Sequence, residues 1–274
     1  MRIPKVKGVI KRRLLVNFRA SPLVVQRLLP HPFRPKLQGG YSLVGICLIR
    51  LEDIRPAGIP GFLGISSENA AHRIAVEWSD SSGVLREGVY IPRRDSNSWL
   101  NHLAGGRIFP GIHHAAKFSI IDRPPCVKVV MRSIDGSTSV SVTGREVDAL
   151  PDSSCFKSLG QASGFFEGGS LGYSAGRQAE TSDGLVLSTK DWQVHPLEVS
   201  EVHSSYFEDI NLFPSGTVTF DHALIMRDID HEWHGAPDLH HEQPFKRMSE
   251  VNQPPPQSTV HTSSIFNKRS PVRS

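Results

Sequence analysis

The sequence predicts a mainly β, single-domain protein with a few short helices, of the α+β class. Short runs rich in β-branched and aromatic residues recur along the chain, separated by Gly, Pro, Asp and Ser. The 23 glycines and 20 prolines fit a turn-rich protein better than a helical bundle. The 274 residues can form one such domain, because β barrels and sandwiches of about 200 to 250 residues commonly do.

A short helix is expected near the start, in SPLVVQRLLP, where Ser21 precedes a proline at the first helical position and Pro30 ends the segment. Short helical turns are expected at 153–164 and 203–212. The number and spacing of the strands suggest a barrel or a sandwich. The expected strands are 41–52, 72–79, 85–92, 115–122, 127–133, 137–143, 184–194 and 217–227.

The net charge of +4 sits at the two ends of the chain. Six Lys and Arg residues lie in the first thirteen positions, and five follow residue 245 against a single Glu, so the body of the chain is acidic. We therefore expect no nucleic-acid partner. Residues 1–11 are predicted to be a basic extension, and residues 237–274, which are polar and proline-broken, a disordered tail.

Cysteine and histidine usage indicates a reducing compartment and no metal site. Cys47, Cys126 and Cys155 are an odd number without a CxxC pair, which argues against a disulfide scaffold or a structural zinc site. HEWH at 231–234 is not the HExxH motif, because its histidines are three positions apart rather than four. No apolar stretch approaches the length of a signal peptide core or a membrane span. We expect a cytoplasmic protein that does not bind a membrane.

The segment SSENAAHRIAVEW at 66–78 places polar residues beside an expected strand. Alternation puts His72 and Arg73 on opposite faces and makes Arg73 a neighbour of Glu77. The simplest interpretation is a surface ion pair between Arg73 and Glu77, with His72 hydrogen-bonded near the core. Glu68 precedes the strand, where its carboxylate could either cap backbone donors or project into a cavity.

IPRRDS at 91–96 ends another expected strand with two consecutive arginines. Arg93 and Arg94 must point to opposite faces while the strand persists, so only one of them can reach a given pocket. An inward guanidinium would bind a carboxylate or phosphate, and the alternative is a surface ion pair with Asp95.

Four segments taken together resemble successive blocks of the acetoacetate-decarboxylase-like superfamily: NFRASPLVVQRLLPHPFRP, GGYSLVGICLIRLEDI, SSENAAHRIAVEW and AGGRIFPGIHHAAKF. The resemblance covers about residues 12–235 and is greatest to the YqjF-like branch, a domain of unknown function. It implies a curved antiparallel sheet that closes into a cone-like barrel over residues 12–236, with a small-molecule pocket inside.

The resemblance also bears on the chemistry. Decarboxylases of this superfamily carry two adjacent lysines in the block that matches 107–116; one forms a Schiff base with the keto acid, and its neighbour lowers the pKa of that lysine. This chain has His113 and His114 there, and imidazole cannot form the protonated imine. Glu68 falls near a pocket glutamate of those enzymes, and Arg107 matches the arginine before their lysines.

Two functions follow as alternatives. The first is an enzyme that acts by acid/base chemistry on a small oxo or carboxylate compound, because imidazole titrates near neutrality. The second is a non-catalytic module that binds or senses an anionic metabolite or carbonyl compound. No cofactor is expected, and a homo-oligomer is an additional option. The candidate proton carriers are Glu68, His113 and His114, and the candidate substrate-binding residues are Arg94, Arg107 and His72.

Overall fold

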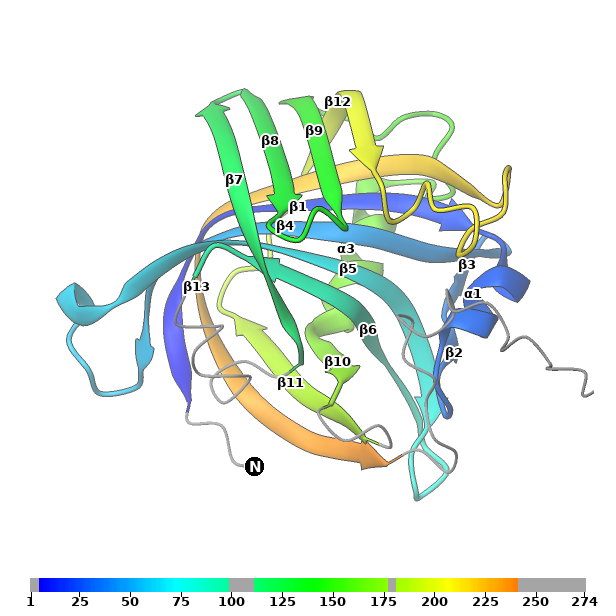
Figure 1. The fold of residues 1–274 in the computed structure, drawn as a ribbon, viewed down its shortest axis with the longest axis horizontal. Coiled ribbons are helices and arrows are strands. Elements are labelled where there is room, and N and C mark those ends of the chain that lie inside the picture. The colour runs from blue at the N-terminus through cyan, green and yellow to red at the C-terminus, as the bar shows by residue number, and fades with distance from the viewer. Residues whose placement is uncertain (1–4, 99–110, 177–180, 241–274) are drawn as a thin grey trace, which may run out of the picture.

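The computed structural model describes residues 5–98, 111–176 and 181–240, which form a single thirteen-stranded sheet with short helices (Figure 1). The strands are β1 Val6–Ala20, β2 Arg34–Pro35, β3 Leu37–Gln38, β4 Tyr41–Pro56, β5 Ile65–Ser79, β6 Leu85–Ser96, β7 His113–Arg123, β8 Cys126–Ser133, β9 Ser139–Glu146, β10 Leu171–Ala175, β11 Thr181–Thr189, β12 His195–Ser204 and β13 Val218–His240. The helices are α1 Pro22–Leu28 and α3 Leu159–Glu167, and single 3-10 turns span η1 Gly61–Leu63 and η2 Gly168–Ser170.

The long strands belong to two closed rings, because β6 and β13 each change partner along their length. β13 pairs with β12 near its start, through residues 223–225, and with β11 over residues 231–240. β6 pairs with β10 through residues 89–91 and with β7 through residues 94–96. One ring therefore includes β10 and β11 and the other β7, β8, β9 and β12, while β13, β1, β4, β5 and β6 are common to both. Figure 1 shows the two groups on either side of the long strands.

Each ring surrounds its own hydrophobic cluster, since successive side chains of a strand point to opposite faces. Leu14 and Leu15 of β1 are both buried, but Leu14 belongs to the larger cluster and Leu15 to the other. The larger cluster includes Phe33 and Trp78, whose rings pack edge to face at 5.3 Å. The second cluster includes Phe156 and Phe166, which bring α3 against the sheet. The five shared strands are thus buried on both faces.

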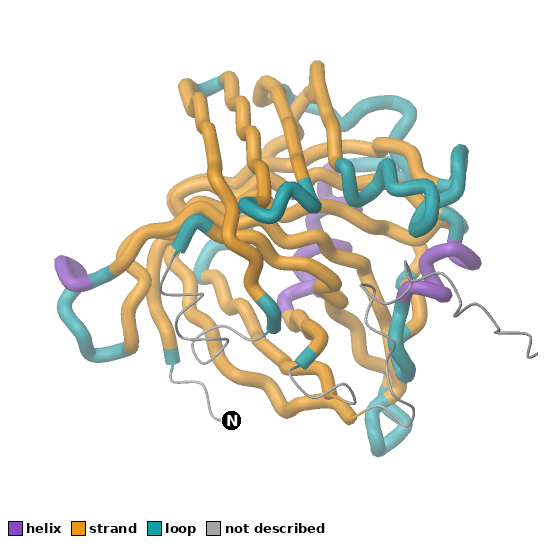
Figure 2. Tube along the Cα trace, in the orientation of Figure 1, coloured by secondary structure: helices purple, strands orange, loops and turns teal. Residues whose placement is uncertain are grey.

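The mainly β fold with few helices confirms the prediction, and each of the eight expected strands corresponds to an observed one. The sheet is mixed rather than wholly antiparallel, because β6 runs parallel to both β7 and β10. Strands β1, β10 and β12 and the two-residue strands β2 and β3 were not expected, whereas the helix at Pro22–Leu28 was. Short turns are present at 203–212, as expected (Figure 2).

The domain limits also differ from those predicted. β1 begins at Val6, inside the expected basic extension, because Val6 and Ile10 are buried between β13 and β4. β13 continues to His240, four residues into the expected tail, because it pairs there with β11. The rest of that tail lies outside the described residues.

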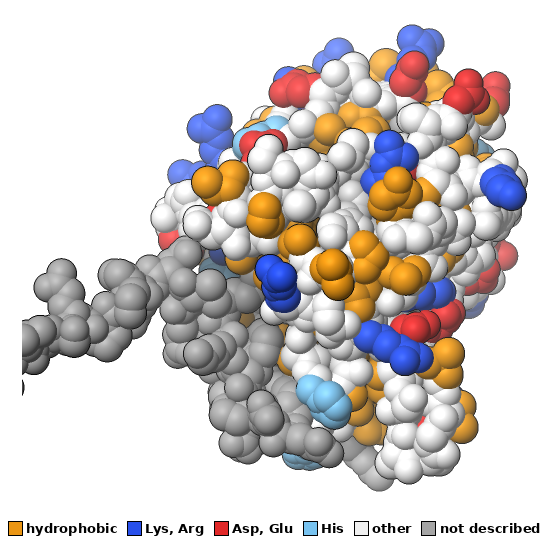
Figure 3. Space-filling view, turned by 90° about the vertical axis from the view of Figure 1, so that its right-hand side faces the viewer, with side chains coloured by type: hydrophobic (Ala, Val, Ile, Leu, Met, Phe, Trp, Pro, Cys, Tyr) orange, Lys and Arg blue, Asp and Glu red, His pale blue; other side chains and the backbone are white. Residues whose placement is uncertain are grey.

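Figure 3 views the side of the molecule on which α1 lies. On this side the basic side chains are scattered among acidic and apolar ones rather than gathered into one patch. Within the described ranges, no helix combines the length and the hydropathy that crossing a bilayer requires.

Candidate functional site

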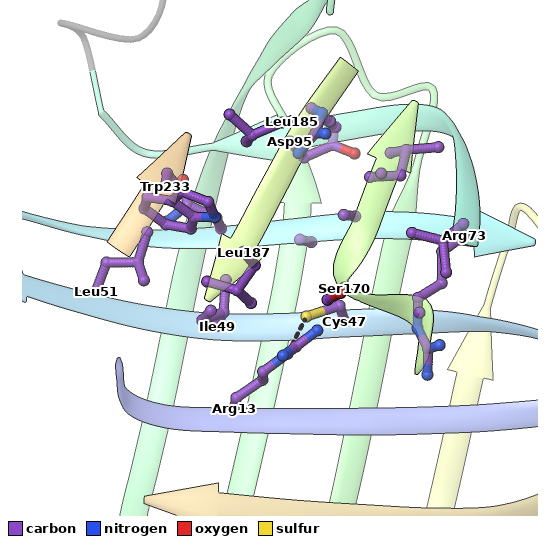
Figure 4. Close-up of a pocket in the computed structure, with 18 of the residues that line it drawn as sticks. Arg13, Cys47, Ile49, Leu51, Arg73, Asp95, Ser170, Leu185, Leu187 and Trp233 are labelled. Carbon is purple, nitrogen blue, oxygen red and sulfur yellow. Dashed lines mark hydrogen bonds between the residues drawn. The ribbon is translucent and has the colours of Figure 1, made fainter. Parts of the chain in front are cut away.

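A cavity of about 120 Å³ lies inside the ring that contains β10 and β11 (Figure 4). Its walls come from β1, β4, β5, β6, β10, β11 and β13, from the start of β7 and from the η2 turn. Most of the wall is apolar, and this part includes Ile49, Leu51, Ile91, Leu185, Leu187 and Trp233. A cavity of this size is well below the roughly 300 Å³ that drug-sized ligands need, so it suits a molecule of a few heavy atoms.

Three arginines line this apolar cavity from three strands of the ring: Arg13 from β1, and Arg73 and Arg94 from the neighbouring strands β5 and β6. Arg13 Nε donates to the thiol of Cys47 across 3.2 Å, as Figure 4 shows. Arg73 donates through Nη2 to Asn17 Oδ1, and its side chain is buried. Arg94 Nε donates to Ser174 Oγ across 3.1 Å. All three partners are neutral groups.

The three guanidinium groups therefore bring positive charge into the cavity, which the carboxylate of Asp183 offsets in part at Arg94. Among the described residues, none of the three forms an ion pair with a carboxylate. Burial lowers the pKa of both Arg73 and Arg94 to about 10. Both groups thus remain charged at neutral pH, and the charge favours an anion in the cavity.

Two buried nitrogen atoms of these arginines, Arg13 Nη1 and Arg73 Nε, have no hydrogen-bond partner among the described residues. Buried donors are normally satisfied, and an unsatisfied donor on a charged group is costly. An anion in the cavity would supply acceptors of the kind that these donors lack.

His113 lines the cavity at the start of β7, where it stands opposite Arg94 in the parallel pairing of β6 and β7. His114 points elsewhere. It lines a second cavity of about 460 Å³, with its Nδ1 3.6 Å from Asp135 Oδ2. Burial lowers the pKa of His114, and the charge of Arg93 acts in the same direction. The two adjacent histidines therefore face different spaces.

Arg93 and Arg94, which are also adjacent in the sequence, likewise point in different directions. Arg93 donates to both carboxylate oxygens of Asp95, at 2.9 and 2.8 Å, and Asp95 is only 1% exposed. Arg94 points into the first cavity, and it borders the second cavity as well. In this pair Asp95 is buried and Arg93 is partly buried, so it is not the surface ion pair that was expected.

Glu68 and His72 lie outside the lining of the first cavity. Glu68 accepts a hydrogen bond from Arg12 Nη2 across 2.7 Å, and Asp122 is bound by the same guanidinium. Burial raises the pKa of Glu68, although Arg12 opposes this shift. Of the predicted site residues, the structure brings Arg94 and His113 together and separates Glu68, His72 and His114 from them; Arg107 lies outside the described residues.

His72 is fully buried in the larger cluster, with Nε2 3.2 Å from Ser204 Oγ and its ring against Tyr206. Burial lowers its pKa to about 3, so it is neutral at physiological pH. Its place on the face opposite Arg73 follows the predicted alternation. Arg73, however, does not pair with Glu77, which binds Arg34.

Arg13 and Arg73 line the cavity but were not among the predicted site residues. Arg13 follows the predicted extension of residues 1–11 and lies in β1, a strand that was not expected, while Arg73 was expected in a surface ion pair. Alternation along β5 already places Arg73 on the face opposite the apolar residues. It does not show that this opposite face is buried as well, because its burial depends on the ring that β10 and β11 close. Within the described ranges, no group of three His, Cys, Asp or Glu side chains is placed to hold a metal ion.

No family model matches the sequence, and no curated protein matches it. Solved structures do match. Acetoacetate decarboxylase from Legionella pneumophila subsp. pneumophila str. Philadelphia 1 superposes with a TM-score of 0.55 at 12% identity, over 86% of this chain and 88% of that one. A second acetoacetate decarboxylase gives a TM-score of 0.55 at 12% identity, over 88% and 91% of the two chains.

The enduracididine biosynthesis enzyme MppR, in complex with pyruvate, gives a TM-score of 0.51 at 8% identity, over 88% of this chain and 91% of that one. At these identities the likeness concerns the fold. The chain therefore has the acetoacetate-decarboxylase-like fold, with a mainly β sheet closed around an arginine-rich cavity.

Proposed function

We propose that the chain binds a small organic carboxylate in the cavity lined by Arg13, Arg73 and Arg94. The observation that carries the proposal is the presence of three guanidinium groups in an apolar cavity, none of them ion-paired to a carboxylate of the described residues. Guanidinium groups bind carboxylates through paired, charge-assisted hydrogen bonds, and these bonds are stronger where water is excluded.

A binding function that does not use a Schiff base fits the lining better than the chemistry of a decarboxylase does. The described residues around the cavity include no lysine, and His113 and His114 occupy the positions where decarboxylases are expected to carry theirs. Lys117, the next lysine in the sequence, is exposed on β7. We accordingly propose that the chain belongs to the YqjF-like branch of the superfamily rather than to its decarboxylases.

The size of the cavity and the fold neighbours support a short keto acid as the first ligand to test. A volume of about 120 Å³ admits an acid of a few carbons. The neighbour MppR has been solved with pyruvate bound. Pyruvate carries a carboxylate for the guanidinium groups and an apolar methyl group for the wall formed by Ile49, Leu187 and Trp233.

Acid/base catalysis on such a compound is the second candidate, and the position of His113 is the observation that favours it. His113 lines the cavity beside Arg94, so a bound acid would lie within reach of both. The second expected proton carrier, Glu68, is occupied by Arg12 outside the lining. This candidate therefore depends on His113 as the proton carrier.

We also propose a cytoplasmic location. Cys47, Cys126 and Cys155 are all free. Free thiols without disulfides are typical of a reducing compartment.

The test is isothermal titration of the purified chain with pyruvate, alongside acetate, succinate and phosphate. We expect saturable pyruvate binding that Arg73→Met and Arg94→Met each weaken by about tenfold or more, since a hydrogen-bonded charged group is worth about 1.5–3 kcal/mol. Arg132→Met removes an exposed arginine of β8 and is the matched control. Absence of binding for all four anions in a cooperatively folded protein contradicts the proposal.

Two further measurements separate binding from catalysis. Borohydride reduction in the presence of pyruvate should leave the protein mass unchanged, because only an imine with a lysine would be trapped. Proton NMR of each keto acid incubated with the protein in D₂O should show no exchange at the carbon next to the carbonyl. Exchange that His113→Gln abolishes would establish the acid/base alternative instead.

A further inference from the structure

Arg73 is the end of a buried chain of hydrogen bonds that leads away from the cavity to an aspartate. Its Nη2 donates to Asn17 Oδ1, and Asn17 Nδ2 lies 3.0 Å from Nε2 of His222. Nδ1 of the same imidazole lies 2.6 Å from Oδ2 of Asp221. The exposed fractions of Asn17, Asp221 and His222 are 1%, 2% and 0%. The chain links β5, β1 and β13 through residues that are more than 50 positions apart.

The direction of every bond in this chain follows from Arg73. A guanidinium group only donates hydrogen bonds, so the atom of Asn17 that faces it must be the amide oxygen. The amide nitrogen of Asn17 then faces His222, and because it only donates, His222 Nε2 must accept. The proton of the neutral imidazole is therefore on Nδ1, which donates to Asp221. One tautomer and one amide orientation satisfy the whole chain.

The far end of the chain is firmly held. Asp221 also accepts hydrogen bonds from Ser154 Oγ at 2.7 Å and from the backbone N–H of Cys155 at 3.0 Å. These bonds and His222 lower the pKa of Asp221 despite its burial, so it is a carboxylate. The imidazole of His222 packs against the rings of both Phe156 and Phe166, with centroids at 5.3 and 5.7 Å. Each group in the chain is thus locked by packing and hydrogen bonds.

The chain does not neutralise Arg73, because its direct partner is a neutral amide. The carboxylate of Asp221 stands two side chains away, which orients the guanidinium while leaving its charge for another partner. Within the part of the chain that the structure describes, the Nε of Arg73 has no hydrogen-bond partner, and the guanidinium lies over the ring of Phe166 at 4.8 Å. One edge of the group is therefore held by Asn17 and another edge remains available.

We propose that Asp221, His222 and Asn17 are positioning residues that hold Arg73 in the orientation required to bind the carboxylate ligand. The inference rests on the proposed function and extends it to three residues that do not line the cavity. A ligand on Arg73 polarises the same chain, so its binding changes the hydrogen bond at His222. A merely structural role of His222 would give no such response.

The decisive variant is Asn17→Asp, which keeps the size of the side chain. The new carboxylate pairs directly with Arg73 and cannot donate to His222, so it both neutralises the guanidinium and interrupts the chain. We expect the dissociation constant for pyruvate to rise by about tenfold or more, the size of effect that loss of an orienting partner typically has. Asn211→Asp, which adds the same charge at an exposed turn, is the matched control and should bind like the wild type.

A second variant and a spectroscopic measurement keep the test valid if Asn17→Asp folds poorly. Asp221→Asn leaves the cavity lining untouched and should weaken pyruvate binding by a few-fold, whereas His203→Gln, an exposed histidine outside the chain, should not. In ¹⁵N-labelled protein, long-range proton–nitrogen spectra should show His222 protonated on Nδ1. Its nitrogen shifts should move on addition of pyruvate in the wild type and in Arg132→Met, but not in Arg73→Met.

The outcomes separate this inference from the proposed function. If the wild type binds pyruvate, and both Asn17→Asp and Asp221→Asn bind it equally well, the positioning role is wrong and the anion site stands. Protonation of His222 on Nε2 alone would also overturn the positioning role, because the bond from Asn17 could not then exist. If neither pyruvate nor the other anions bind to the wild type, the proposed function fails, and the positioning role fails with it.

Discussion

Arg12 and Arg13 are neighbours in β1, yet they serve opposite faces of the sheet. Arg12 forms a buried ion pair with Glu68, with 2.7 Å between Nη2 and Oε2, and Arg13 lines the cavity. Leu14 and Leu15, which follow them, divide between the two hydrophobic clusters in the same way. The ion pair of Arg12 and Glu68 therefore lies on one face of the sheet, and the cavity whose arginines are proposed to bind a ligand lies on the opposite face.

This arrangement predicts that Glu68→Gln affects stability and not binding. The variant leaves the charge of Arg12 buried, with Asp122 at 3.2 Å as its remaining carboxylate partner. We expect a loss of about 1–3 kcal/mol in the free energy of unfolding, measured by urea denaturation, because removal of one partner exposes the cost of burying the other. The dissociation constant for pyruvate should stay within about twofold of the wild type. A loss of binding without a loss of stability would return Glu68 to the site.

Local patterns in the sequence were sufficient to predict the strands whose apolar residues are contiguous or alternate regularly. β5 is an example, since the faces of His72 and Arg73 could be assigned in advance. β1 escaped prediction because its buried residues, such as Val6 and Ile10, alternate with lysines that resemble a solvated extension. The parallel pairings of β6 could not be predicted, because they depend on which distant strands close each ring.

The site was predictable only in part, for the same physical reason. The adjacent pairs Arg93–Arg94 and His113–His114 must divide between two faces, and the structure shows Arg94 and His113 on the same side. Nothing local indicates that Arg13 joins them from a strand about 80 positions earlier. The contact between Asn17 and His222 spans 205 positions, and a single sequence carries no record of such a pairing.

The state of the arginines predicts how anion binding depends on pH. Burial lowers the pKa of Arg73 and Arg94 to about 10, so both are charged below that value and lose their charge as the pH rises through it. Pyruvate affinity should be constant between about pH 7 and 9 and should fall above about 10. Titration calorimetry across this range checks the expectation.

Arg73→Lys sharpens this test, because a buried ammonium group loses its proton more readily than a guanidinium group does. The fall in affinity should begin at a lower pH in this variant than in the wild type. A fall that begins between pH 6 and 8 in the wild type would show that a histidine, rather than an arginine, carries the charge that binds the ligand.

Acid should destabilise the protein through His72. Its pKa is about 3 in the folded protein and about 6.5 when exposed, so below pH 6.5 the unfolded chain binds a proton that the folded chain does not. The free energy of unfolding should therefore decrease as the pH falls from about 6.5 toward 3, by up to about 1.4 kcal/mol per pH unit for this group. His231, with a pKa lowered by burial to about 4, acts in the same direction.

His72→Gln keeps a polar group for Ser204 but does not titrate, so it should reduce the slope of stability against pH between about pH 4 and 6. Urea denaturation at several pH values measures that slope. Asn211→Gln, at an exposed residue that does not titrate, should leave it unchanged. Equal slopes in His72→Gln and in the wild type would mean that His72 is not the group that takes up the proton.

The cavity wall formed by β6 and β10 requires a glycine at position 88. A Cβ atom there would collide with the carbonyl oxygen of Leu171, which belongs to the backbone and cannot move aside as a side chain would. Gly88→Ala should therefore separate the two parallel strands and lower the free energy of unfolding by about 1–3 kcal/mol, the usual cost of overpacking. It should also weaken pyruvate binding, because β6 carries Arg94 and β10 carries its partner Ser174.

Gly164 in α3 provides the matched comparison, since a Cβ atom added there meets nothing within 4 Å. Alanine favours a helix over glycine, so Gly164→Ala should raise the free energy of unfolding by about 0.5–1 kcal/mol and leave pyruvate binding unchanged. Urea denaturation of the two variants gives opposite signs if β6 and β10 pair as described. Destabilisation by both substitutions alike would instead indicate a general intolerance of alanine in this domain, and the close approach of Gly88 to Leu171 would lose its support.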